Sequence, residues 1–220
     1  RHEITRSLFA QLPGSPIAYW LPEELLSALR DRCPLSDTYE AGAGMSTGDS
    51  ARFLRHWHEV SYSRINFNAT DHNTANDSQA KWYPYNKGGG PRRWTGYLDF
   101  VVNWHDEGRE IKDWVVNNPR DPNTTHWSRR LFNIDKFFQP GVTWSAVSGA
   151  DFGVRLVPPG VIPGQGSRTI FGPSAEREKL LAVLNSSFSR AILEAYSPTL
   201  NVESGSVLRV PALPEALDTS

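Results

Sequence analysis

The sequence predicts an α+β fold, in which short strands and a few helices follow one another without regular alternation. Two observations support this class. Short apolar runs between residues 41 and 172 are separated by closely spaced glycines and prolines, of which the 220-residue chain contains 17 and 16. Glycines and prolines at this spacing are typical of short strands joined by turns. Near the C-terminus, Leu180, Leu184 and Ile192 recur at helical spacing.

The first sixty residues are expected to hold two helices. Residues 1–20 are expected to form an extended segment, because they contain two prolines and a glycine close together. A helix is predicted over Pro22–Arg32, because its leucines share one stripe and proline suits the first turn. Residues 35–40 predict a short strand. Thr47 or Asp49 is expected to cap a second, short helix, in which three apolar side chains lie inward: Phe53, Leu54 and Trp57.

The middle of the chain predicts a hairpin followed by a helix. Residues 61–80 are polar and predict mostly loop. Residues 81–85 and 97–102 are expected to pair as two strands, because glycines and a proline between them form a turn. A helix is predicted over residues 106–116. Asp106-Glu107 lies at its start, where carboxylates favour the helix dipole.

The C-terminal half predicts further short strands and then a helical segment. Strands are expected around residues 142–144, over 152–157, and once or twice within 161–171. The helical segment covers residues 174–196, and Asn185-Ser186 is expected to divide it into two helices. A last short strand is predicted over Val207–Val210.

Composition narrows the possible classes of protein. Lys and Arg number 23 against 24 Asp and Glu, so any nucleic-acid surface must be a local patch. The single cysteine, Cys33, excludes an internal disulfide and argues against a cysteine-based metal site. No apolar run approaches membrane-spanning length and no signal-peptide pattern opens the chain, so we expect a cytoplasmic protein without membrane contact. The chain begins without Met and ends in a polar tail, and we expect it to be a piece of a longer protein.

The stretch from Lys81 to Trp104 interleaves cations with aromatic rings around three consecutive glycines. A flexible loop of this composition suits binding to a polyanion with stackable bases. Lys and Arg bind phosphates, and Arg also makes bidentate hydrogen bonds to guanine. The alternative is a plain hairpin with a solvated turn. We expect Lys87, Arg92 and Arg93 to face DNA, whereas Asn86 either contacts a base or caps the glycine turn.

Other binding candidates flank this stretch. A turn rich in Gly, Ser and Thr precedes the short helix near residue 50, and it offers polar and basic groups: Thr47, Asp49, Arg52 and Arg55. The carboxylate of Asp49 alternatively caps the helix, and the two arginines alternatively form internal ion pairs. Arg129 and Arg130 are either a phosphate clamp or a solvated face.

Catalytic and cofactor motifs are missing from the sequence. Asn118-Pro119-Arg120 lacks the second proline and the aromatic residue of the amino-methyltransferase motif. Gly88–Gly90 lacks the Lys-Ser/Thr of a phosphate-binding loop. His56 and His58 have no further ligands at a recognisable spacing, so no metal site is expected.

The order of several motifs resembles the C-terminal half of BREX-type (PglX-like) adenine-specific DNA methyltransferases of phage defence, and more distantly type IIG restriction–modification enzymes. The segments that carry this resemblance are FAQLPGSPIAYWLPEELL (9–26), GMSTGDSARFLRHWHEV (44–60), KWYPYNKGGGPRRWTGYLDFVVNWHDEGREIK (81–112), FFQPGVTWSAVS (137–148) and LLAVLNSSFSRAILEAYSPTLN (180–201). Ser50 replaces the usual Asn of the family pattern, and Thr95 replaces the usual aromatic residue.

The resemblance implies a target recognition domain over residues 21–210, with a junction from an upstream methyltransferase domain over 1–20 and a polar tail over 211–220. It implies an irregular twisted β region with flanking helices and a C-terminal α-helical hairpin, similar to DNA methylase specificity domains. S-adenosylmethionine and the catalytic motif would belong to the upstream domain. The piece itself would bind double-stranded DNA and position it for methylation without being an enzyme, and the residues named above would make the contacts.

A second class of function stays open. The chain is alternatively a protein-interaction domain whose aromatic surface docks other subunits of a defence complex, which predicts an exposed apolar patch and weak DNA binding. A DNA-recognition module instead predicts one positive face that includes residues 86–93, with an affinity that falls steeply with salt.

Overall fold

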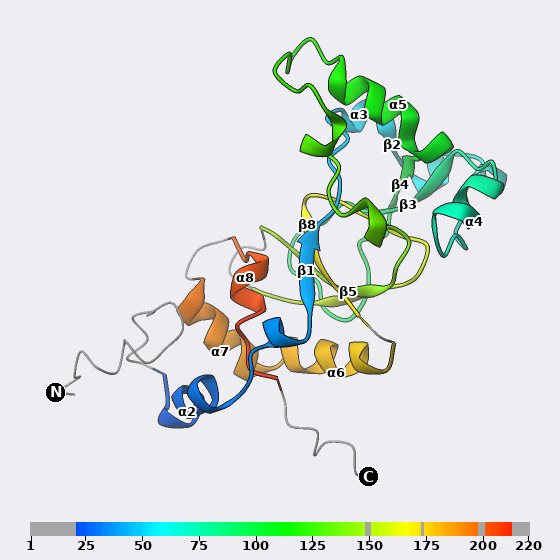
Figure 1. Ribbon diagram of the computed structural model, residues 1–220. Coiled ribbons are helices and arrows are strands. Elements are labelled where there is room, and N and C mark those ends of the chain that lie inside the picture. Colours follow the sequence, from blue (N-terminus) through cyan, green and yellow to red (C-terminus); the bar gives the residue numbers. More distant parts are fainter. Residues whose placement is uncertain (1–20, 148–150, 173, 198–200, 213–220) are drawn as a thin grey trace.

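Two four-stranded sheets, each with its own helices, make up the computed structural model of this protein (Figure 1). The structure describes residues 21–147, 151–172, 174–197 and 201–212. Strands and helices alternate irregularly along the chain, which confirms the predicted α+β class.

The first sheet, here called the helix-backed sheet, is antiparallel, with strand order β1-β8-β5-β6. Helix α6 packs against β5 and β6, and the short helix α8 packs against β1. The core between them contains Trp144, whose indole N–H donates to the Val202 carbonyl at 2.8 Å. The bounds of these elements are β1 (Glu40–Ala43), β5 (Gly141–Ser145), β6 (Arg155–Val157), β8 (Ser167–Phe171), α2 (Glu23–Asp31), α6 (Ser174–Leu184), α7 (Ser187–Tyr196) and α8 (Ser204–Val207).

The second sheet, here called the hairpin sheet, has strand order β2-β4-β3-β7. Strands β3 and β4 form the predicted hairpin, and β7 joins β3 in parallel. Helix α5 covers this sheet and contributes Ile111 and Val115 to its core. The bounds are β2 (Leu54–His56), β3 (Trp82–Asn86), β4 (Phe100–Asn103), β7 (Ile162–Pro163), α3 (Ser50–Phe53), α4 (His72–Asp77) and α5 (His105–Val116), with 3₁₀ turns at Leu35–Asp37, Trp57–Glu59, Tyr62–Arg64, Trp127–Arg129 and Ile134–Lys136.

The two sheets meet where β3 ends and where β7 leads into β8. The backbone N–H of Gly164 donates to the Asn86 carbonyl at 3.0 Å, and Met45 donates to the Pro163 carbonyl at 2.9 Å. A Cβ on Gly44 would lie 1.8 Å from the Pro163 carbonyl oxygen, so the chain can cross here only at a glycine. The hydrophobic residues fall into separate clusters on either side of this junction.

Several predicted elements are confirmed. The hairpin pairs Trp82 with Asn103 and Tyr85 with Phe100. The helical segment divides at Asn185-Ser186, because the Ser186 hydroxyl caps α7 by accepting from the Ser189 N–H at 3.3 Å. The proposed boundaries of the recognition domain stay a prediction, and residues 1–20 and 213–220 lie outside the described residues.

Three local predictions were wrong. Residues 35–37 form a 3₁₀ turn, and the strand begins only at Glu40. Val207 ends helix α8 rather than opening a strand, and an isolated bridge pairs Pro34 with Pro211 just after it. Trp57, predicted to face inward, is 47% exposed because the short helix ends at Phe53.

The first turn of α5 differs from the predicted helix start. Asp106, Glu107 and Gly108 all have left-handed backbone angles, with φ of 51°, 53° and 71°. The two carboxylates lie at the N-terminal end of α5 as predicted, but on a left-handed turn and not on a regular helical one. Asp106 also pairs with Arg109 at 2.9 Å, and Glu107 accepts from the Asn76 amide at 3.3 Å.

Candidate nucleic-acid interface

Residues 87–99, here called the bridging loop, leave the hairpin sheet after β3, touch the helix-backed sheet and return at β4. The Gly89 N–H donates to the Ser145 hydroxyl at 3.1 Å. Trp94 lies along β6, donating to the Val154 carbonyl and accepting from the Leu156 N–H, each at 2.9 Å. The loop was expected to be flexible, but hydrogen bonds hold it at both ends and in the middle.

The strand register places a cationic depression of about 410 Å³ at the end of the hairpin sheet. His56 lies opposite Phe100, which lies opposite Tyr85, so Lys87 emerges beside them. The Lys87 ammonium lies 4.4 Å from the Phe100 ring centroid, and the His56 ring packs on the same ring at 4.4 Å. The depression, here called the hairpin-end depression, is lined by Ser50, Ala51, Leu54, Arg55, His56, Glu59, Lys87 and Phe100.

Only one carboxylate lines the hairpin-end depression, and the backbone already uses it. Glu59 accepts from the His56 N–H at 2.7 Å. Arg55 folds back onto the end of α3, where Nη1 donates to the carbonyls of Ala51 and Leu54 at 2.6 Å each. The other nitrogens of Arg55 have no hydrogen-bond partner among the described residues, so they can donate to an anion.

The residues around α3 divide between structure and surface. Asp49 caps the helix by accepting from the Arg52 N–H at 3.0 Å, and Thr47 is buried. The Arg52 guanidinium is exposed and lies 5.0 Å from the Trp114 ring centroid, which leaves its nitrogens open to solvent. The structure therefore gives Asp49 and Thr47 internal contacts and places Arg52 at the surface.

The three candidates around the bridging loop lie in different environments. Asn86 is 1% exposed, and its amide donates to the Thr143 hydroxyl at 2.9 Å. A base cannot reach it in this arrangement, and its contacts are those of a structural residue. Arg93 pairs with Asp151 at 2.8 Å. Arg92 is exposed and its guanidinium lies 4.6 Å from the Tyr97 ring centroid.

The second basic cluster lies in a separate depression of about 290 Å³, lined by Asp121, Asn123, Thr124, Arg129 and Arg130. Arg130 pairs with Asp121 at 2.7 Å, and this hydrogen bond, with a weaker one from Thr124, lowers the pKa of the Asp121 carboxyl. Arg129 is exposed and has no carboxylate within ion-pair distance among the described residues.

Half of the ten candidates thus remain as cations without a carboxylate partner in the part of the chain that the structure describes. These are Arg52, Arg55, Lys87, Arg92 and Arg129. Sequence reasoning missed three residues that shape the same surface, namely His56, Tyr97 and Arg155. His56 and Phe100 are neighbours only because β2 pairs with β4, a long-range contact that the sequence did not predict, and no local signal marks Arg155 either.

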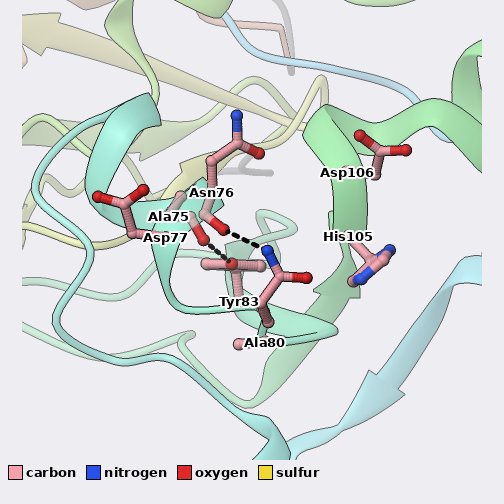
Figure 2. A pocket seen from close by; sticks show the side chains of 8 residues that line it. Ala75, Asn76, Asp77, Ala80, Tyr83, His105 and Asp106 are labelled. Atoms are coloured by element: carbon pink, nitrogen blue, oxygen red, sulfur yellow. Dashed lines mark hydrogen bonds between the residues drawn. The ribbon is translucent and has the colours of Figure 1, made fainter.

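A further pocket of about 470 Å³ lies between α4 and α5. Figure 2 shows Asp77 and Asp106 on opposite sides of it, with the Tyr83 hydroxyl donating to the Ala75 carbonyl at 2.7 Å. No pair of acids converges here. Among the described residues no group of three or more His, Cys, Asp or Glu side chains could hold a metal ion. No helix in the described ranges is long and apolar enough to cross a bilayer.

Comparison with known proteins gives two relatives, whereas no protein-family profile matches. The adenine-specific methyltransferase PglX of Lacticaseibacillus casei (strain Zhang) is 36% identical over 205 residues, which is 92% of this chain and 16% of the relative. The adenine-specific methyltransferase BrxX of Escherichia coli O9:H4 (strain HS) is 31% identical over 209 residues, which is 93% of this chain and 16% of the relative. This chain is therefore a homologue of one segment, 16% in length, of adenine-specific methyltransferases.

Proposed function

We propose that this chain is the DNA-recognition domain of an adenine-specific DNA methyltransferase of a BREX-type phage-defence or restriction–modification system. It binds duplex DNA and positions it, while a separate domain of the same protein holds S-adenosylmethionine and transfers the methyl group. The names of the two relatives support the methyltransferase context. The chain itself makes no methyl transfer in this proposal.

The observation that carries the DNA-binding role is the hairpin-end depression. Lys87 and Arg55 both line it, Lys87 lies beside the Phe100 ring, and the one acid of the lining, Glu59, accepts a backbone hydrogen bond. Two cations and one carboxylate leave the depression with a net positive charge. Phosphate oxygens supply the missing negative charge, and the aromatic ring lowers the hydration of the ammonium above it.

The binding mechanism is electrostatic contact followed by local readout. Each cation that neutralises a phosphate releases counter-ions, so affinity depends steeply on salt. Arg92 projects from the bridging loop with its guanidinium stacked on Tyr97. This contact orients the planar guanidinium for bidentate hydrogen bonds to a phosphate or a guanine edge. The adenine to be modified would be flipped into the methyltransferase domain, outside this chain.

One feature favours the alternative, a surface that docks other proteins. Tyr62 is 72% exposed and packs against Phe67, with ring centroids 5.3 Å apart. An exposed aromatic pair is common in the centre of protein interfaces. If this surface were the main function, Tyr62→Ala would abolish capture of a partner subunit and the cationic residues would be dispensable.

Binding of a short duplex to the 220-residue chain tests the proposal. We expect the double variant Lys87→Ala/Arg92→Ala to reduce the slope of log K against log salt by about 1.8, since each lost phosphate contact removes about 0.9. Arg209→Ala is the matched control, because the Arg209 guanidinium also stacks on a tyrosine, Tyr196, at 5.2 Å but lies beside α8.

The outcomes of that titration distinguish DNA recognition by these residues from its alternatives. An unchanged slope in the double variant would refute these residues as the phosphate contacts. A chain that binds no duplex, even at low salt, would refute DNA recognition by this chain and favour the protein-docking alternative. A fall of about 0.9 in Arg209→Ala, half of that expected for the double variant, would show that the loss of net charge alone was measured.

A further inference from the structure

Arg155 opens strand β6 and is completely buried, with 0% of its surface exposed. It lies under the bridging loop, where the sheet pairing and the Trp94 bridge bring the two sheets together. Fully buried arginines are almost always paired with a carboxylate. Arg155 has none among the described residues, and its contacts are with neutral groups.

The hydrogen bonds of Arg155 are few and long. Nη2 donates to the Asn86 amide oxygen at 3.3 Å, and Nη1 donates to the Ser145 hydroxyl at 3.5 Å. Nε has no partner in the part of the chain that the structure describes. A guanidinium has five N–H donors, so most of the hydrogen-bonding capacity of this buried cation is unused.

The Arg155 side chain also contacts Tyr97 of the bridging loop. Its guanidinium carbon lies 4.9 Å from the Tyr97 ring centroid, and that of Arg92 lies 4.6 Å from the same centroid. Two guanidinium groups, one buried and one exposed, thus share a single ring. Like charges this close raise the energy of the unbound protein, and an anion beside them lowers it.

Arg155 remains charged at neutral pH. Burial lowers its pKa to about 10, the Tyr97 hydroxyl opposes this shift and the neighbouring Arg92 adds to it. The direction shows that the protein interior and Arg92 both disfavour the cation. An internal acid would relieve that cost, but the described residues place none there.

We propose that Arg155 is a positioning residue for phosphate binding, which acts through Tyr97 to hold Arg92 and the triglycine turn and whose unneutralised charge attracts a DNA phosphodiester to Arg92. This inference rests on the proposed DNA-binding function and adds a residue to it. The Ser145 hydroxyl links the two parts, because it accepts from Arg155 and also hydrogen-bonds the carbonyls of Gly89 and Gly90.

The variant Asn86→Asp separates the charge of Arg155 from its structural contacts. It puts a carboxylate where the Asn86 amide oxygen already accepts from Arg155. The Thr143 hydroxyl, which accepts from the Asn86 amide and donates to the Arg168 carbonyl at 2.8 Å, must give up the Arg168 bond to donate to the new oxygen. The variant thus exchanges one hydrogen bond for another, and the positive charge below the loop is neutralised.

We expect Asn86→Asp to remain folded and to bind duplex DNA about tenfold more weakly at low salt, as for one cation acting on the order of 10 Å from a phosphate. The salt dependence should become shallower. Asn66→Asp is the matched control, because it adds the same charge at a partly exposed position near Trp82, the opposite end of β3. That control should bind like the wild type.

A second variant keeps the test decisive if Asn86→Asp does not fold. Arg155→Met removes the charge with a similar volume, an exchange that is often neutral or stabilising at buried charged sites. We expect weaker, less salt-dependent DNA binding from it, and Arg155→Lys should restore most of the affinity.

The proposal is overturned if a folded Asn86→Asp or Arg155→Met protein binds DNA with the wild-type affinity and salt slope, since Arg155 would then only support the fold. It is also overturned if Asn66→Asp weakens binding as much as Asn86→Asp. If the wild type binds no DNA, the proposed function fails and this inference fails with it. If the wild type binds DNA and the variants bind it equally well, only the inference about Arg155 is refuted and the proposed DNA-binding function stands.

Discussion

Replacing Gly88 with alanine should destabilise the protein through two separate effects. Gly88 has φ of +83°, and a Cβ there would lie 2.4 Å from the Gly166 carbonyl oxygen. Left-handed backbone costs a residue with a Cβ roughly 1–2 kcal/mol. The clash adds a further cost, because the obstructing atom belongs to the backbone between β7 and β8 and cannot rotate away.

Together these effects predict a loss of about 2–3 kcal/mol in the free energy of unfolding. For a protein of this size that corresponds to a melting temperature lower by roughly 4–12 °C. The bridging loop is also pushed off Gly166, so the low-salt affinity for duplex DNA should fall in the same variant.

Gly90→Ala is the matched control in the same turn. Its Cβ would meet only the Tyr97 hydroxyl, at 3.4 Å, which is an ordinary van der Waals contact. Alanine there should change stability by less than about 0.5 kcal/mol, or raise it slightly by restricting the unfolded chain. Urea denaturation followed by circular dichroism measures both variants. Equal midpoints for Gly88→Ala and Gly90→Ala would refute the idea that close packing against Gly166 holds the turn.

Three other predictions follow from the same contacts. Arg93→Ala should lower the salt slope of DNA binding less than Lys87→Ala, since Arg93 pairs with Asp151, which it shares with Arg190, whereas Lys87→Ala should lower the slope by about 0.9 in the same titration. Gly44→Ala should destabilise the fold by more than 2 kcal/mol in urea denaturation, because its Cβ would lie 1.8 Å from the Pro163 carbonyl oxygen; a stable variant would contradict the tight junction. Burial and the Glu176 hydrogen bond raise the pKa of Tyr39 to about 12, so its contribution to stability is complete below pH 10 and is lost as the pH rises from 10 to 12. Thermal melts over that range should therefore fall less steeply for Tyr39→Phe than for the wild type, and parallel curves would refute a Tyr39 contribution.

Local sequence patterns predicted the elements whose cause is local. The break at Asn185-Ser186 follows from a serine cap, and the β3–β4 hairpin follows from two apolar runs around a glycine turn. The cap at Asp49 was likewise offered as an alternative from its position alone, and the structure shows that contact. In each case residues within a few positions of one another determine the outcome.

Long-range contacts explain what the sequence did not reveal. Arg155 is buried by Tyr97 and Asn86, which lie 58 and 69 positions earlier, and nothing around it distinguishes it from an exposed strand residue. Asn86 looked like a turn residue because glycines follow it, yet β5 supplies its partner, Thr143. The left-handed turn at Asp106 was missed because two of its three residues are not glycine.

The residues proposed to contact DNA are held by the same bonds that join the two sheets. Ser145 binds the triglycine turn, β6 binds Trp94, and Tyr97 rests on the buried Arg155. A rigid duplex presents phosphates at fixed spacing, so a preorganised set of cations loses little conformational entropy on binding. The glycines therefore serve close packing rather than mobility. It follows that substitutions at the junction should weaken stability and DNA affinity together, whereas substitutions of Lys87 or Arg92 should weaken affinity alone.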